Sequence, residues 1–379
     1  MKKVDKYLFE NLFKPFLGSV LVLTMILLLN SIFQLLDLIV KKGVSLPMVT
    51  KVVVYTLPFI VNMTFPMSFL VAALISFGKL AANNEFLALK SSGIDLKVVF
   101  LKLVVFLFFL VICNVIFNFW ILPATNFRLK RVLFDIRVAK PAIQIEAGVF
   151  NKIENFLIFA DKKDDKTGLL VGVKIQAITG EGVKFISAEK GKVLTSGNGS
   201  IVMELFNGEF VETRGEKREE FRRGLFKRDV VILRTSKEDF YSDVVFKGDR
   251  EKSIKELLKE VREGKTELST YSKEDKVSRY FTRRRINSIL AEIHTRIALP
   301  FASIIFVLLA FPIAMRFRFS GYGSALGFSF FFFILYYILL LAGQEISRRT
   351  TFNAFLAIWL PNFAFGSIAY SLIKGELKK

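Results

Sequence analysis

Long apolar stretches alternate with polar segments along this chain, and this pattern predicts membrane-spanning helices. Six stretches contain no Asp, Glu, Lys or Arg: 15–36, 52–78, 103–127, 297–315, 319–344 and 350–373. The shortest has 19 residues, and roughly 20 helical residues span the ~30 Å hydrocarbon core of a bilayer. We therefore expect six transmembrane helices. The first should stay in the protein, because its apolar part is longer than that of a cleaved signal peptide.

A polar insert of 169 residues, 128–296, separates the first three helices from the last three. Short segments rich in β-branched and aromatic residues, punctuated by glycines, predict strands in this insert. They are 142–150, 153–160, 169–178, 183–188, 201–206, 209–213 and 230–233. Strands spaced about ten residues apart favour a sandwich or a jelly roll. The expected fold class is a polytopic α-helical membrane protein with an inserted, jelly-roll-like β domain.

A helix over about residues 253–263 is predicted after the strands. Ser253 and Glu256 have the spacing of a capping box. The apolar residues Ile254, Leu257, Leu258 and Val261 form one stripe on this helix. We interpret it as a helix docked on the β domain, with binding of a partner as the alternative. The expected division of the chain is 1–127, 128–280 and 281–379.

Composition and charge narrow the class of protein. Hydrophobic residues make up 53% of the chain and the mean hydropathy is +0.45, which is too apolar for a set of soluble domains. The net charge of +20 is compatible with nucleic-acid binding, but many of the basic residues bracket the apolar stretches, where they anchor helices and contact anionic lipid. A membrane protein is therefore the favoured class.

Charge also predicts the orientation in the membrane. An even number of helices puts both termini on one side and the insert on the other. Short segments on the side of the termini carry 13 Lys and Arg, against five on the opposite side, which favours cytoplasmic termini. Arg128 and the run 283–285 at the ends of the insert count against this, and an inverted orientation is the alternative.

Residue types needed for catalysis or metal binding are sparse. His294 is the only histidine, so it lacks a second histidine for a metal site, and we interpret it as an interfacial side chain. Cys113 is the only cysteine and is interpreted as a small packing residue. Gly264 begins a Gly-Lys-Thr sequence, but Lys259 stands where a P-loop requires its first glycine. We expect no enzyme activity, no cofactor and no metal, so ATP hydrolysis would belong to another subunit.

The loop between helices two and three predicts a short helix at the membrane face, over about residues 83–93. Asn83 or Asn84 can cap it, Glu85 lies in the first turn, where the helix dipole favours an anion, and Gly93 ends it.

Much of this short helix is apolar, through Phe86, Leu87 and Leu89. Such a surface needs a cover, either lipid headgroups or a groove in a partner protein. The sequence pattern is compatible with both.

Two stretches carry a family resemblance. Residues 78–95, of the form GKL…E…AL…GI, resemble the cytoplasmic coupling helix of the LptF/LptG permeases of the lipopolysaccharide-export ABC transporter. Residues 292–300 are similar to the segment that leads into the fourth transmembrane helix of that family. The arrangement of three helices, a β-rich insert and three helices agrees, so the resemblance covers essentially the whole chain. One departure is Asn84, where the family often has a small hydroxyl residue.

The resemblance implies a permease without its own ATPase site. It would pair with a second permease of the family, as a heterodimer or homodimer, and bind cytoplasmic ATPase subunits. The pair would extract lipopolysaccharide or another glycolipid from the bacterial inner membrane. The β domain would lie in the periplasm and pass the lipid to a bridge of similar jelly rolls.

The resemblance also implies roles for particular residues. ATPase coupling is assigned to Glu85, Phe86, Leu87, Ala88 and Gly93. For Glu85 we expect a contact with a basic residue of the ATPase, and the alternative is a carboxylate that only stabilises its own helix.

Lys41 and Lys42 end the first helix at the expected outer headgroup level, where they would bind the phosphates of the glycolipid. The alternative is that both are interfacial anchors. Phe328, Phe331 and Phe332 of helix five are assigned to a lateral gate beside helix one, although a plain lipid-facing stripe has the same pattern.

Two other functions stay open from the sequence, a secondary transporter and a membrane scaffold with an external β domain. Pro58 and Pro66 interrupt helix two, as in some secondary transporters, but no acidic residue accompanies them. Copurification of a nucleotide-binding subunit would separate the ABC permease from both.

Overall fold

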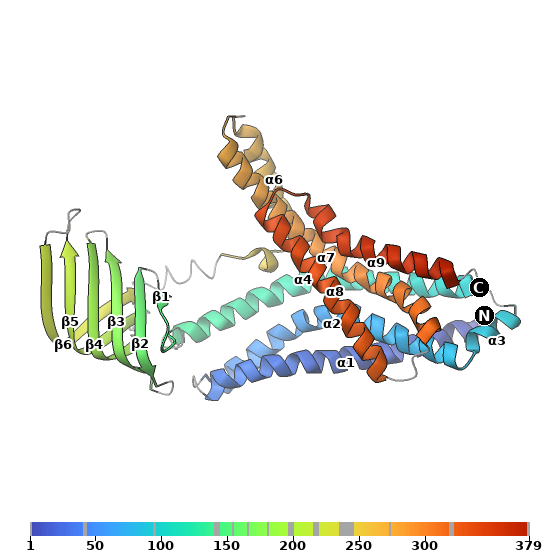
Figure 1. Cartoon of the computed structure of the whole chain (residues 1–379), viewed down its shortest axis with the longest axis horizontal. Helices are drawn as coiled ribbons and strands as arrows, with labels where there is room; N and C mark the ends of the chain where they lie inside the picture. Colours follow the sequence, from blue (N-terminus) through green and yellow to red (C-terminus); the bar gives the residue numbers. More distant parts are fainter. Residues whose placement is uncertain are drawn as a thin grey trace. The chain divides into compact units, whose positions relative to one another are not determined.

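A computed structural model describes residues 2–40, 44–93, 96–139, 145–153, 155–164, 167–179, 182–195, 201–214, 220–234, 246–272, 274–317 and 322–376. The chain forms two compact units, which are described separately. The helical unit contains Met1–Leu29, Tyr55–Phe127 and Gly248–Lys379, and the β unit contains Asn30–Val54 and Arg128–Lys247. Figure 1 labels the helices and strands.

The helices account for the apolar stretches of the sequence. They are α1 (Lys2–Val40), α2 (Leu46–Ala82), α3 (Glu85–Ser91), α4 (Leu96–Ala139), η2 (Asp249–Glu251), α6 (Ile254–Thr270), α7 (Lys276–Phe317), α8 (Tyr322–Arg349) and α9 (Ala354–Glu376). Within the described residues, six helices are long and apolar enough to cross a membrane, namely α1, α2, α4, α7, α8 and α9. The prediction of six spans, three before the insert and three after it, is confirmed.

The helical unit is packed around α7, which contacts α6, α8 and α9. Phe306 of α7, Tyr336 of α8 and Phe365 of α9 meet in an aromatic cluster, with ring centroids 5.3 to 6.0 Å apart. All three side chains are buried. Edge-to-face contacts of this kind fix the relative rotation of helices as well as burying apolar surface.

The β unit contains one antiparallel sheet whose strands follow the order of the chain (Figure 1). The strands are β1 (Asn151–Ile153), β2 (Phe156–Lys163), β3 (Leu169–Thr179), β4 (Gly182–Thr195), β5 (Ile201–Arg214) and β6 (Glu220–Arg234). The inserted β domain is thus confirmed. Crossovers between non-neighbouring strands, which a jelly roll has, are not found among the strands described.

One face of the sheet forms the core of the β unit. Ile158, Ile175, Ile186 and Phe210 lie opposite one another on four successive strands, and the three isoleucines are at most 3% exposed. Because side chains alternate between the faces of a strand, the residues between them point to the opposite face.

Two strand predictions are wrong in detail. The described part of the predicted strand 142–150 is not a strand, because Gly148 has φ +80° and the Asn151 side chain bonds the backbone of Glu146 at 2.8 and 2.9 Å, which makes a turn. The predicted strands 201–206 and 209–213 are one strand, β5. Residues 220–229, which are rich in charge, also belong to a strand, β6.

Residues 201–206 and 209–213 are predicted as separate strands because glycine often marks a turn, whereas Gly208 lies inside the strand. Gly208 is paired with Phe226 across β5 and β6, and Phe210 is paired in the same way with Gly224. A Cβ atom on Gly208 would lie 2.5 Å from the Phe226 ring, and one on Gly224 would lie 2.6 Å from the Phe210 ring. Each glycine leaves room for the aromatic ring of the opposite strand, a known use of glycine inside sheets.

The predicted capping box before α6 is formed. The Ser253 hydroxyl accepts from the Glu256 amide, and the Glu256 carboxylate accepts from the Ser253 amide at 2.7 Å. Leu257 and Val261 are buried against Ile286, Ile289 and Ile293 of α7. The described partner of α6 is therefore α7, and both lie in the helical unit. The three-part division at residues 127 and 280 stays a prediction.

Candidate functional site

The short helix α3 lies between α2 and α4, where the sequence predicts it. Asn84 has φ +54°, a left-handed conformation that Asn tolerates better than most residues and that ends α2. The Ala88 amide then donates to the Asn84 carbonyl at 3.1 Å and begins α3. Gly93, with φ +74°, follows the last turn, as expected for a helix C-terminus.

The carboxylate of Glu85 is held by two side chains. Asn83 Nδ2 donates to Oε1 at 3.0 Å, and the hydroxyl of Tyr7 donates to Oε2 at 2.8 Å. Tyr7 belongs to α1, 78 positions away in the sequence. A carboxylate oxygen accepts more than one hydrogen bond, so both oxygens keep capacity for a donor from outside the chain. The arrangement orients the negative charge of Glu85 without neutralising it.

Phe86 is partly buried by the chain itself. Its ring meets the ring of Phe311 on α7 edge to face, with centroids 5.8 Å apart, and the ring of Phe77 on α2 meets the same Phe311 ring edge to face at 5.6 Å. Phe86 packs against the main core of the helical unit. Part of the apolar surface expected to need lipid or a partner is therefore internal, while Ala88 is exposed. The side chain of Leu87 lies outside the described residues.

The three phenylalanines assigned to a lateral gate have different surroundings on α8. Phe331 is 63% exposed, whereas Phe332 packs inward, 6.2 Å from Phe365 of α9. Phe328 also packs against the core. Leu326 and Phe333, in the same stretch of α8, pack against a cluster that contains Leu23 of α1 and Met67 and Val71 of α2. The gate role of Phe328, Phe331 and Phe332 beside α1 stays a prediction.

The predicted headgroup ligands Lys41 and Lys42 lie outside the described residues. Nothing in the structure tests their role, which stays a prediction. The described residues contain no group of three or more His, Cys, Asp or Glu side chains that could hold a metal ion.

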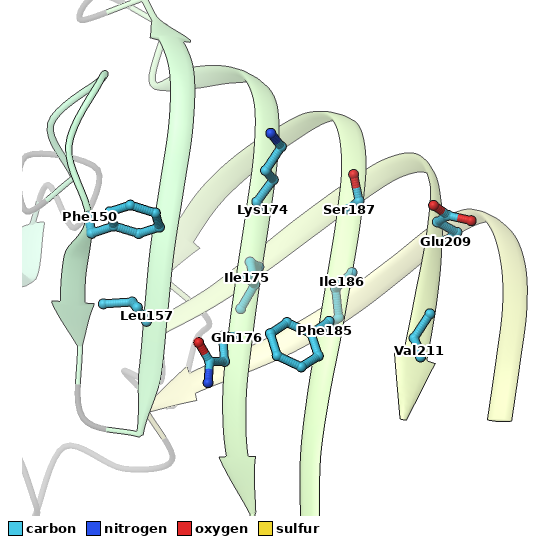
Figure 2. Close-up of a pocket in the computed structure, with 10 residues that line it drawn as sticks. All are labelled: Phe150, Leu157, Lys174, Ile175, Gln176, Phe185, Ile186, Ser187, Glu209 and Val211. Carbon is cyan, nitrogen blue, oxygen red and sulfur yellow. The ribbon is translucent and has the colours of Figure 1, made fainter. Parts of the chain in front are cut away.

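The outer face of the β sheet contains a hollow of about 360 Å³ (Figure 2). Leu157, Gln176, Phe185 and Val211 form one row across four strands, and Lys174, Ser187 and Glu209 form a second row beside it. Phe150 lies over the end of the hollow and contacts the ring of Phe159 at 5.1 Å. The hollow combines apolar side chains with one ammonium and one carboxylate group.

Buried polar side chains within the spans are a feature that sequence reasoning missed. Asn118 of α4 donates to the Oδ1 atoms of Asn62 at 2.7 Å and of Asn114 at 2.8 Å. Arg296 of α7 is only 3% exposed and pairs with Glu292 at 3.1 Å. Counting charge-free stretches ignores uncharged amides, and it treats a buried arginine as the end of a span. The spacing of four residues in Asn114/Asn118 and Glu292/Arg296 was the available signal.

These features define a multi-pass membrane protein with an inserted β domain and a short helix at one end of its bundle. Comparison with protein families matches residues 6–374 to the family described as lipopolysaccharide export system permease LptF/LptG, and the chain belongs to this family. The protein is therefore a transporter component, of the class that serves lipopolysaccharide export. A search of curated proteins found no match.

Proposed function

We propose that this protein is the permease subunit of an ABC transporter that extracts lipopolysaccharide or a related glycolipid from the bacterial inner membrane. Separate cytoplasmic ATPase subunits power it, and α3 is their docking helix. A second permease of the same family completes the membrane pathway. The β domain passes the glycolipid to periplasmic jelly-roll proteins.

The orientation of Glu85 is the observation that carries this proposal. A carboxylate used only to stabilise its own helix needs no partner from another element. Here the Tyr7 hydroxyl of α1 fixes the carboxylate at 2.8 Å, and Asn83 fixes the other oxygen at 3.0 Å. A fixed negative charge beside an exposed helix surface suits a basic residue of a partner, because charge-assisted hydrogen bonds depend strongly on geometry.

The hollow in the β sheet supports the handling of an amphipathic lipid. Its apolar row fits acyl chains, and the Lys174 ammonium group lies beside them, 5.9 Å from the centre of the Phe159 ring. A secondary transporter gains no comparable support from the β unit.

Copurification tests the proposed function directly. The chain, expressed in its native host with an affinity tag, is expected to bring down an ABC ATPase and, when reconstituted with it, to transfer glycolipid in an ATP-dependent way. A chain that purifies without any ATPase, or that supports no transfer once the ATPase is present, contradicts the proposal.

The side of the membrane on which the insert 128–296 lies is a separate prediction. Lys259 of α6 and Ser92 beside α3 are both exposed, and the proposed topology puts them on opposite sides of the membrane. In a Cys113→Ser background, a cysteine at position 259 is therefore expected to react with a membrane-impermeant thiol reagent on intact spheroplasts. A cysteine at Ser92 beside α3 should react only after lysis. The reversed pattern would show that the insert is cytoplasmic.

A further inference from the structure

The connecting segment 248–253 leads from the β domain into the helical unit and is held by arginines of α7. It contains η2 and ends at the N-cap of α6. Its backbone carbonyls and the side chains of Asp249 and Lys252 contact charged groups of α6 and α7. The contacts lie within the helical unit.

Arg296 uses all of its guanidinium nitrogens in this connection. Nη1 donates to the Lys252 carbonyl at 2.9 Å, Nη2 donates to the Asp249 carbonyl at 2.8 Å, and Nε donates to Glu292 at 3.1 Å. The side chain is 3% exposed. The planar fork of arginine can bind two carbonyls and a carboxylate at once, which the single ammonium group of lysine cannot do in the same geometry.

Arg285 holds the same segment from a second point on α7. It lies eleven residues before Arg296, about three helical turns, and therefore on the same face of the helix. Its guanidinium group donates to both carboxylate oxygens of Asp249, at 2.8 and 2.6 Å, and to Glu260 of α6 at 3.1 Å. Asn126 of α4 adds a hydrogen bond to the Arg250 carbonyl at 3.4 Å.

The positive groups around Asp249 favour its ionised form. Burial raises the pKa of Asp249, but the hydrogen bonds and positive charges of Arg285 and Lys252 outweigh burial and leave that pKa below its usual value. Lys252 also pairs with Glu260. A partly buried ion network of this kind adds little net stability compared with apolar packing, but it specifies one arrangement of the groups it joins.

The C-terminal part of α7 contacts the candidate site. Phe311 touches Phe86 of α3 at 5.8 Å and lies 15 residues from Arg296, about 22 Å along the helix. Pro300 lies inside α7 between them. Beside this proline, the Ala298 carbonyl accepts hydrogen bonds from Tyr336 at 3.4 Å and Asn362 at 3.0 Å, which tie α7 to α8 and α9. One helix thus joins α3 to the connecting segment.

We infer that α7 is a mechanical link from α3 to the connecting segment, with Arg296 and Arg285, in the N-terminal half of α7, as the joint. Movement of α3 on ATP binding shifts Phe311, and the joint carries the shift of α7 into the segment that leads to the β domain. Arg296 is a positioning residue in this scheme and does not bind the glycolipid. The inference rests on the proposed function, because it takes α3 as the docking helix of the ATPase.

The test compares Arg296→Lys with Arg283→Gln, an exposed arginine of the same helix, in the reconstituted transporter. Arg296→Lys keeps the positive charge but loses the planar guanidinium group. Because Arg296 does not contact α3 within the described residues, ATP hydrolysis should stay within about twofold of the unaltered protein. Glycolipid transferred per ATP should fall about 2- to 30-fold, the usual range for a position that carries coupling between sites. Arg283→Gln should change neither. An unchanged ratio in Arg296→Lys, or a parallel loss of both activities, overturns the inference.

A second measurement does not depend on transport. Amide hydrogen exchange of the segment 248–253 in the full-length protein should become faster in Arg296→Lys and also in Phe311→Ala, although Phe311 is far from that segment. If Phe311→Ala leaves hydrogen exchange of the segment 248–253 unchanged, the two arginines only hold that segment locally and the mechanical link is rejected. If the unaltered complex transfers no glycolipid while the exchange result holds, the proposed function fails and the link in α7 stands.

Discussion

Glu85→Ala is expected to weaken the binding of the ATPase by roughly 10- to 100-fold while the protein still inserts in the membrane. A hydrogen bond to a charged group contributes about 1.5–3 kcal/mol, which corresponds to that range of affinity. The measurement is the amount of ATPase retained by the purified permease, together with ATP-dependent glycolipid transfer. Normal binding and transfer by Glu85→Ala would leave the carboxylate as a simple first-turn residue, worth about 0.3–1 kcal/mol to the helix.

Two variants separate the charge of Glu85 from its orientation. Glu85→Gln keeps the shape but removes the charge, so it should weaken ATPase binding nearly as much as Glu85→Ala. Tyr7→Phe keeps the charge and removes only the hydrogen bond at 2.8 Å from α1, so its effect should be smaller. If Tyr7→Phe has the larger effect, the contact within the chain matters more than a contact with the ATPase.

Gly343→Leu is expected to prevent the normal packing of α8 on α9. A Cβ atom on Gly343 would lie 2.3 Å from the Ala357 carbonyl oxygen and 2.9 Å from its carbon, both backbone atoms of α9. Backbone cannot move aside as a flexible side chain does, and small residues let membrane helices approach closely. Gly343→Ala alone should lower stability by about 1–3 kcal/mol, the usual effect of overpacking, and the larger leucine should block folding. Thermal unfolding in detergent micelles measures both.

Gly327 provides the matched control on the same helix. Among the described residues, no atom outside the adjoining turns of the helix lies within 4 Å of a Cβ at this position, and alanine is a better helix former than glycine by about 0.8–1.0 kcal/mol. Gly327→Ala should therefore unfold at the same temperature as the unaltered protein or higher. Equal losses from the two alanine substitutions would mean that close contact with α9 is not the reason for Gly343.

The prediction of α3 shows how far local signals reach. Glu85 and Gly93 are a first-turn anion and a helix terminator, and each acts within a few residues of its own position. Capping of α3 by the side chain of Asn83 or Asn84 stays a prediction. The helix lies at Glu85–Ser91, inside the predicted range. The capping box at Ser253 is formed for the same reason. In the β domain, local signals failed where glycine faces an aromatic ring on the next strand, because that pairing depends on register between strands.

Taken by itself, the sequence determined the number of spans, the place of the β insert and the short helix before the third span. These follow from hydropathy and capping, whose physical causes are the thickness of the bilayer and the unpaired backbone groups at helix ends. Only the tertiary structure decided that Tyr7 orients Glu85, that Phe311 packs against Phe86 and that Arg296 binds the carbonyls of Asp249 and Lys252. Those contacts join residues far apart in the chain, and they form only when several helices pack together, so no local pattern encodes them.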